Sequence, residues 1–173
     1  MPPMTTPALL LGEGLTLLGT VRCFGQAGIP SYVLTEPDHL ARHSRWYRTL
    51  PDHSVSLTGY DELEPLLQRL EFEKAVLVPC SDNWAAAVGR LDPKVAERFP
   101  TVVSPLEVLQ PLIDKGAFGR MLAETGVPHP RTFELEGQAC LEQVPDESFE
   151  QGFLKPRDSM AFVDAFGSKA FDF

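Results

Sequence analysis

The sequence has few cysteines and no long apolar run, and these two absences exclude several classes of protein. Its 173 residues include three cysteines, Cys23, Cys80 and Cys140, which are widely spaced and form no CxxC pair. This pattern fits neither a disulfide scaffold nor a zinc site, and it favours reduced thiols in a cytoplasmic protein. The apolar runs are far shorter than the roughly 20 residues of a membrane-spanning helix. Residues 1–7 also lack the basic start of a secretory signal.

Positive charge is also scarce. Fifteen lysines and arginines stand against 24 aspartates and glutamates, which gives a formal net charge of −9. This excess disfavours non-specific binding to nucleic acid or to an anionic membrane, so we expect neither partner. Hydrophobic residues make up 43 % of the chain, close to the average of globular proteins. The chain can therefore form the core of one or two small domains.

Short apolar segments alternate with helical patterns over the first 103 residues. The alternation predicts a parallel sheet with helices on both faces, that is, a Rossmann-like α/β domain with right-handed crossovers. Strands are predicted at 8–11, 31–35, 45–50, 74–78 and 101–103, and helices at 16–27, 61–70, 84–90 and 92–98.

After residue 104 the pattern changes. Helices are predicted at 105–109 and 114–125, strands at 131–135 and 152–155, a short helix within 136–150, and a loop or strand from 157 onward. The sequence therefore predicts two domains, 1–104 and 105–173, the second a smaller and incomplete α+β unit.

A glycine loop follows the first predicted strand. Gly12 and Gly14 have the spacing of a dinucleotide-binding fingerprint, but Leu17 stands where the third glycine is required. No lysine follows in the manner of a P-loop, so a tight strand-to-helix turn explains these glycines. The loop lies at the carboxyl end of a strand, where open α/β sheets bind ligands, so its backbone amides remain candidate substrate contacts.

Ser81, Asp82 and Asn83 follow another predicted strand and are further candidate substrate contacts. The alternative is structural, because Ser81 or Asp82 could cap the next helix. His39 and His43 would share one face of a helix, as metal ligands do, but no second cluster supports them and we assign no metal site. We identify no catalytic nucleophile–base pair. Cys23 is predicted to lie in the core.

Two lysines have unusual settings. On a helix, Lys115 lies on one stripe with Phe118 and Met121, at the edge of a face that should be buried. Lys155 ends a short apolar segment and would point to the same side of a strand as Phe153. A lysine beside buried surface must reach water or meet an anion, so the pair suggests a phosphate site for ATP.

The order of these features resembles the ATP-grasp superfamily of carboxylate–amine or carboxylate–thiol ligases. The resemblance rests on Asp114-Lys115, on Gly-Val-Pro-His-Pro at 126–130, and on Phe-Leu-Lys-Pro at 153–156. It covers essentially the whole chain and implies a pre-ATP-grasp domain followed by the start of the ATP-grasp domain. Residues 159–170, with Ser159 and Lys169, resemble the phosphate-covering loop of one branch of that family, although other branches carry more glycines there.

The resemblance implies that Lys115, Lys155, Ser159 and Lys169 bind ATP. It also implies a two-step reaction, in which a carboxylate is phosphorylated and an amine or thiol then displaces phosphate. The acidic residues and asparagine that hold Mg²⁺ in the family would come from a further C-terminal half, so we assign no metal ligand. We expect this chain to be an N-terminal fragment or a truncated relative that does not catalyse ligation alone.

Two alternatives remain open. The chain could be a stand-alone Rossmann-like module that binds a small molecule or nucleotide without catalysis. It could also have a purely structural or oligomerisation role, and a homodimer is compatible with any of these hypotheses.

Overall fold

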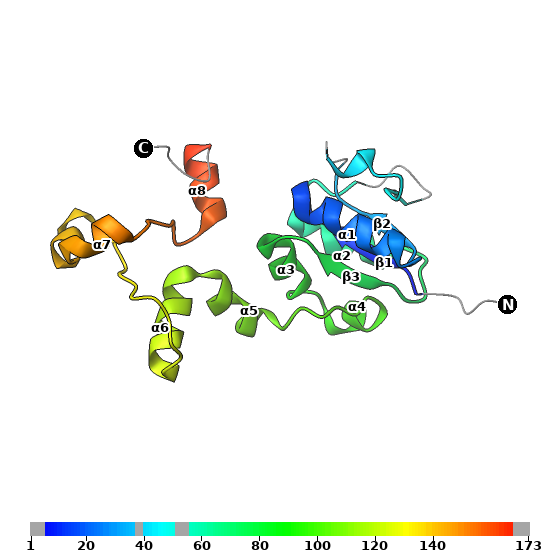
Figure 1. Cartoon of the computed structure of the whole chain (residues 1–173). Coiled ribbons are helices and arrows are strands. Elements are labelled where there is room, and N and C mark those ends of the chain that lie inside the picture. The colour runs from blue at the N-terminus through cyan, green and yellow to red at the C-terminus, as the bar shows by residue number, and fades with distance from the viewer. Residues whose placement is uncertain (1–5, 37–39, 51–55, 168–173) are drawn as a thin grey trace. The chain divides into compact units, whose positions relative to one another are not determined.

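The computed structural model describes residues 6–36, 40–50 and 56–167. The chain divides into two compact units, Met1–Leu109 and Gln110–Phe173. Figure 1 shows the helices and strands of both units.

The first unit is built on a parallel sheet of three strands. These are β1 (Ala8–Leu11), β2 (Ser31–Val33) and β3 (Val76–Pro79), in the order β2-β1-β3. Leu9 of β1 stands opposite Tyr32 of β2 and Leu77 of β3. Three isolated bridges add residues to the edges of the sheet: Thr49 and Leu57 bridge to Val33 and Thr35 beside β2, and Thr101 bridges to Leu77.

The strands predicted at 45–50 and 101–103 are therefore wrong, because each segment contributes only a single bridge. In the first segment, the N–H of Tyr47 donates to the carbonyl of Ser44 at 2.9 Å, so the chain turns where a strand would continue. In the second, Val102 is 95 % exposed and the segment is enclosed by prolines, which cannot extend a hydrogen-bonded ladder.

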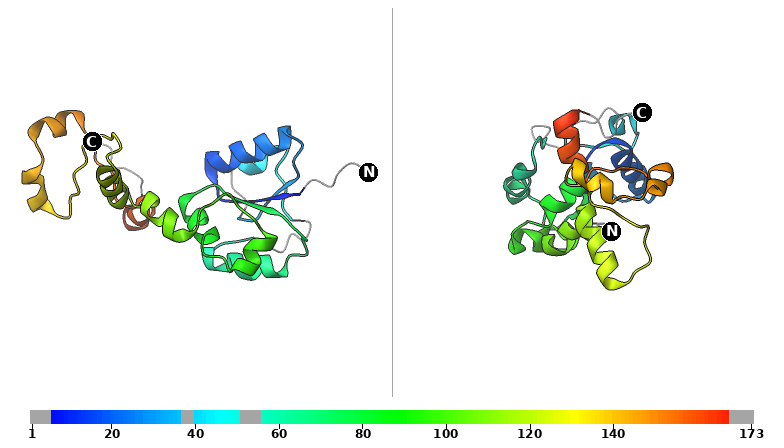
Figure 2. Two further views of the ribbon diagram at one scale, coloured as in Figure 1. Left: turned by 90° about the horizontal axis from the view of Figure 1, so that it is seen from below. Right: turned by 90° about the vertical axis from the view of Figure 1, so that its left-hand side faces the viewer.

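Helices cover both faces of this sheet, as the sequence predicts. One face carries α1 (Gly14–Gln26) and the 3₁₀ turn η1 (Ala41–His43), and the other carries η2 (Tyr60–Glu62), α2 (Leu63–Arg69), α3 (Asp82–Val88) and α4 (Pro93–Arg98). Figure 2 (left) shows the sheet between α1 and the helices of the opposite layer. Among the described helices, none is both long and apolar enough to cross a membrane.

Strand β1 supplies both halves of the core. Leu9 and Leu11 pack into the cluster on one face, and Ala8 and Leu10 into the cluster on the other, because successive side chains alternate across a strand. All four are at most 3 % exposed, and burial of each leucine contributes about 1.5–3 kcal/mol. The uninterrupted apolar run is thus explained by burial on both faces.

Cys23 does not lie in this core. The buried face of α1 is defined by Leu17 and Val21, which are one helical turn apart. Cys23 lies two residues beyond Val21, about 200° around the helix, and its side chain is exposed.

The regular secondary structure described in the second unit is helical. After α5 (Leu106–Ile113), which spans the boundary between the units, come α6 (Lys115–Thr125), η3 (Gln138–Gln143), α7 (Asp146–Gln151) and α8 (Ser159–Phe166). Gly126, with φ of +68°, ends α6 in the left-handed conformation that favours glycine. The helix stop predicted before the Val-Pro pair is therefore confirmed.

The strands predicted at 131–135 and 152–155 are absent from the described part of this unit, where both segments are irregular. Phe153 and Leu154 are 79 % and 76 % exposed, so this segment is not buried although its residues are apolar. A strand requires a partner for its backbone groups, and the described residues provide none here. The residues from 159 onward, predicted as a loop or strand, form α8 up to Phe166.

Candidate functional site

The carboxyl edge of the sheet brings together the loops that follow β1, β2 and β3. The carbonyl of Gly12 accepts a 2.6 Å hydrogen bond from the buried hydroxyl of Thr35, just beyond β2. The N–H of Cys80 donates to the carbonyl of Leu11 at 2.7 Å. These bonds fix the glycine loop at the edge where ligands of open α/β sheets bind.

Gly12 is required by the closeness of Cys80. Its φ is +141°, and a Cβ at this position would lie 2.8 Å from the Cβ of Cys80. The tight packing of the β1 and β3 ends therefore excludes any side chain at Gly12. Gly14 also has a positive φ but faces open space, so its backbone remains accessible to a ligand.

Cys80 is only partly accessible to solvent at this edge. Burial raises the pKa of its thiol above the ordinary value, and the thiol donates a long contact of 3.6 Å to the hydroxyl of Thr20. A half-buried thiol with a raised pKa is protonated at neutral pH and is a poor nucleophile. Its contribution to this edge is packing against the glycine loop.

The three polar residues after β3 have different settings. Ser81 is the N-cap of α3, because its hydroxyl accepts a hydrogen bond from the N–H of Trp84 at 3.4 Å. Asn83 donates from Nδ2 to the hydroxyl of Tyr60 at 3.2 Å. Asp82 lies in the first turn of α3 and is exposed. Of the three, Asp82 is therefore the side chain most available to a ligand.

Tyr60 contacts the residues that follow β3, although no motif in the sequence indicates this. Its ring packs edge-on against Trp84, with ring centroids 4.7 Å apart, while its hydroxyl accepts from Asn83. Tyr60 lies 23 residues before Asn83, in a turn with no recognisable motif. Only packing of η2 against α3 reveals the pair.

In the second unit, Lys115 and Ser159 are brought together. The Lys115 ammonium donates a hydrogen bond of 3.0 Å to the Ser159 hydroxyl, and both residues are partly buried. Within the described residues Lys115 forms no salt bridge, so its charge meets a neutral oxygen. A partly buried ammonium without a carboxylate partner is well suited to an anionic ligand.

The amides at the start of α6 are already satisfied. The N–H of Lys115 donates to the carbonyl of Arg157, and the N–H of Ala117 donates to the Asp114 carboxylate at 2.8 Å. The hydrogen bond from the Ala117 amide and the Arg157 guanidinium hold the pKa of Asp114 below its ordinary value. A phosphate at this place would therefore be met by the Lys115 side chain and not by the helix terminus.

A network of ion pairs links three segments around this point. Arg157 Nε lies 2.9 Å from both carboxylate oxygens of Asp114, which raises the pKa of the guanidinium, and Arg157 Nη1 lies 3.8 Å from Glu134. Glu134 also pairs with Arg120 of α6. Glu134 and Arg157 carry no motif in the sequence, and their pairing across the chain is visible only in the structure.

Gly116 allows this network to approach α6 closely. A Cβ there would lie 2.7 Å from Oε2 of Glu134 and 3.2 Å from Nε of Arg157. The glycine that follows Lys115 thus admits the charged side chains that tie residues 134 and 157 to the first turn of the helix.

Lys155 has a different setting from Lys115. It is exposed, and its ammonium lies 4.6 Å from the centroid of the Phe153 ring, a cation–π contact within an irregular segment. The structure does not give it the partly buried position that a strand would have given it. Lys169 and His39 lie outside the described residues.

His43, the described member of the predicted histidine pair, lies in η1 and is exposed. Among the described residues, no group of three or more histidine, cysteine, aspartate or glutamate side chains is placed to hold a metal ion.

No protein-family profile matches this chain. No curated protein matches it either. Among solved structures, the chain is similar to carboxyaminoimidazole ribonucleotide synthase from Aspergillus clavatus, solved in complex with ATP, with a TM-score of 0.55 and 15 % sequence identity. The similarity covers 89 % of this chain and 38 % of the synthase chain, so the present chain spans well under half of the length of that protein. At this identity the likeness establishes the fold.

Proposed function

We propose that this chain is the N-terminal part of an ATP-grasp ligase that joins a carboxylate to an amine or a thiol through an acyl phosphate. The observation that supports this proposal is the Lys115 ammonium, which is partly buried and, among the described residues, contacts the neutral Ser159 hydroxyl without a carboxylate partner. Its setting supports the hypothesis drawn from the Asp-Lys motif. The fold likeness to a synthase crystallised with ATP adds support.

Lys115 is the residue we assign to the phosphates of ATP. Its counter-charge is missing within the described residues, whereas Arg157, its neighbour in space, is already paired with Asp114 and Glu134. An arriving phosphate would supply that counter-charge, and the ammonium would stabilise negative charge during phosphoryl transfer. Ser159, which already accepts from Lys115, would donate its hydroxyl proton to the same phosphate.

Lys155 and Lys169 remain proposed ATP contacts with weaker support. Lys155 is exposed and free to move from the Phe153 ring toward a nucleotide. The assignment of Lys169 to ATP rests only on the resemblance of its segment to the family's phosphate-covering loop. Mg²⁺ would accompany ATP in the ligase reaction, and we assign none of the described residues to it.

The substrate would bind at the carboxyl edge of the sheet in the first unit. Gly14 offers accessible backbone there, and Asp82 offers an exposed carboxylate that suits an amine. Gly12, Ser81 and Asn83 hold the neighbouring turns through their packing and hydrogen bonds. We therefore propose that they shape this edge, with direct contact from Gly14 and Asp82.

Competitive acylation of lysines tests the ATP site. The full chain is treated with an acetylating ester alone, with ATP or with adenosine, and modification at each lysine is measured by mass spectrometry. ATP should protect Lys115 strongly and Lys155 less, while adenosine should protect neither. Lys94, exposed on α4, is the internal control and should react equally in all three samples.

Equal labelling of Lys115 with and without ATP would contradict the proposed site and favour a stand-alone binding module. A second assay addresses catalysis. Incubation of the chain with ATP, Mg²⁺ and pairs of carboxylates and amines should release no ADP in proportion to protein. Steady release would show that the chain is catalytically complete and would overturn the proposal that it is only part of the ligase.

A further inference from the structure

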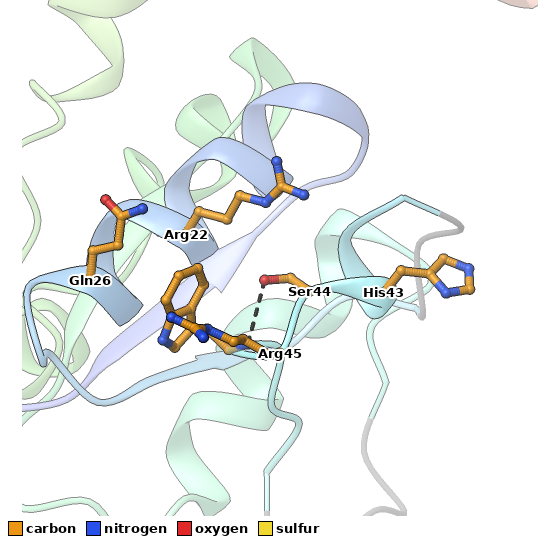
Figure 3. Close-up of a pocket in the computed structure, with 6 residues that line it drawn as sticks. Arg22, Gln26, His43, Ser44 and Arg45 are labelled. Atoms are coloured by element: carbon orange, nitrogen blue, oxygen red, sulfur yellow. Dashed lines mark hydrogen bonds between the residues drawn. The ribbon is translucent and has the colours of Figure 1, made fainter.

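A basic hollow lies on the α1 side of the first unit. Its volume is about 470 Å³, and Figure 3 shows the side chains that line it: Arg22, Gln26, His43, Ser44, Arg45 and Trp46. The hollow is formed by the second half of α1 and by η1 with the residues that follow it. Gln26 stands 12 residues after Gly14, about 18 Å along the helix, so the hollow is separate from the carboxyl edge of the sheet.

The charge of the lining is opposite to that of the protein. Among the described residues, two arginines and no carboxylate line the hollow, in a chain whose formal net charge is −9. Within the described residues, neither Arg22 nor Arg45 forms a salt bridge. Guanidinium groups stay charged at all accessible pH values, so the hollow presents two permanent cations that no described carboxylate neutralises.

Arg45 is held in place by an aromatic platform. Its Cζ lies 4.2 Å from the centroid of the Trp46 ring. Trp46 is itself seated directly on α1, because a Cβ at Gly25 would lie only 2.1 Å from Cγ of the indole. The missing side chain at Gly25 thus allows the indole to lie against the helix and to orient the guanidinium before any ligand arrives.

Ser44 adds a hydroxyl donor to the lining. Ser44 is 9 % exposed. Its Oγ accepts a hydrogen bond from the N–H of Trp46 at 3.4 Å, drawn as a dashed line in Figure 3. That bond uses the oxygen as acceptor and leaves the hydroxyl proton to be donated. Two guanidinium groups and one hydroxyl line this hollow, and each is a hydrogen-bond donor that can bind an oxygen of a tetrahedral oxyanion.

We propose that this hollow binds a phosphate group, either as the free ion or as the monoester of a small metabolite. Arg22 and Arg45 supply the charge and Ser44 a further hydrogen bond. The volume exceeds that of one phosphate ion and leaves room for an organic part beside Gln26. The site uses none of the residues assigned to ATP, so it does not depend on the proposed ligase function.

Titration with inorganic phosphate, followed by the indole N–H signals in two-dimensional NMR spectra, tests the site. The chain has two tryptophans: Trp46 lines the hollow, whereas Trp84 packs in the cluster on the opposite face of the sheet. Ionic strength is held constant with chloride. The Trp46 signal should shift saturably with phosphate, while the Trp84 signal should not move.

Three charge-removing variants make the test specific. Arg22→Gln and Arg45→Gln should each raise the dissociation constant for phosphate about tenfold, since each removes a charge-assisted hydrogen bond. Arg69→Gln, exposed at the end of α2, removes the same charge outside the hollow and should leave binding unchanged. Arg22→Gln remains decisive if Arg45→Gln disturbs the indole, and thermal unfolding confirms that each variant is folded.

Glycerol 3-phosphate, with glycerol as its control, distinguishes the two sources of the anion. Tighter binding of the ester than of inorganic phosphate would support a metabolite, and the reverse would support the free ion. A Trp46 signal that does not saturate with either anion would overturn the proposal. An equal loss of affinity in Arg69→Gln would also overturn it, because the binding would then reflect only overall charge.

Discussion

Lys115 and Ser159 are 44 residues apart in the sequence, and the ammonium of one donates a 3.0 Å hydrogen bond to the hydroxyl of the other. This bond joins the first turn of α6 to the first residue of α8. It leaves the lysine charge without a carboxylate partner in the described part of the chain. The first prediction concerns this charge.

Replacement of Lys115 by glutamine should weaken ATP binding by about tenfold or more, because a charge-assisted hydrogen bond to phosphate is lost. Isothermal titration calorimetry with ATP measures the change. Lys94→Gln removes the same charge from exposed α4 and should bind ATP as the parent does. If Lys115→Gln retains the parent affinity, the nucleotide does not contact this lysine.

The start of α6 should be sensitive to acid. The folded-state pKa of Asp114 lies below its ordinary value, so its stabilising effect is complete at neutral pH. That effect is lost as the pH falls below about 4 toward the folded-state pKa. Amide hydrogen exchange at Ala117 should therefore accelerate relative to other helices in this pH range, after correction for the intrinsic rate.

Asp114→Asn should remove most of this pH dependence, since the variant carries no titratable group at the cap. It should also lose the ion pair to Arg157. Glu124→Gln, exposed within the same helix, should retain the acid sensitivity of the parent. Identical pH profiles for Asp114→Asn and the parent would assign the effect to another group.

Gly12→Ala should destabilise the chain by about 2–4 kcal/mol, because the new Cβ would meet Cβ of Cys80 at 2.8 Å in an unfavourable backbone conformation. Gly19→Ala is the matched control. Gly19 lies inside α1 with open space around it, so alanine there should stabilise by about 0.5–1 kcal/mol. Chemical denaturation monitored by circular dichroism measures both changes, and a neutral Gly12→Ala would disprove the tight contact.

Cys80 should react with iodoacetamide much more slowly than Cys23. Cys23 is exposed on α1, whereas burial raises the pKa of the Cys80 thiol. Because the thiolate is the reactive form, the Cys80 rate should keep rising to a higher pH than that of an exposed thiol. Peptide mapping after timed alkylation measures both rates, and equal rates at neutral pH would show that Cys80 is accessible.

The α/β class of the first unit could be predicted because its signals are local. Ala8–Leu11 is apolar without interruption, as a strand buried on both faces must be, and Gly28 and Pro30 mark the turn before β2. Ser81 was one of two predicted caps, and the structure selects it by the bond from Trp84. The strand predictions at 45–50 and 101–103 were wrong because the single bridges at Thr49 and Thr101 depend on neighbours that are distant in sequence.

Local patterns are sufficient to specify the buried β1 strand, the helix stop at Gly126 and the Asp-Lys pair at the start of α6, since these depend on hydrophobicity, backbone freedom and capping within a few residues. The folded arrangement is needed to see that Lys115 contacts Ser159, that Glu134 and Arg157 form one network with Asp114, and that Trp46 lies on Gly25. These relationships join segments that are far apart in the chain. Their energies depend on distances that no local pattern encodes.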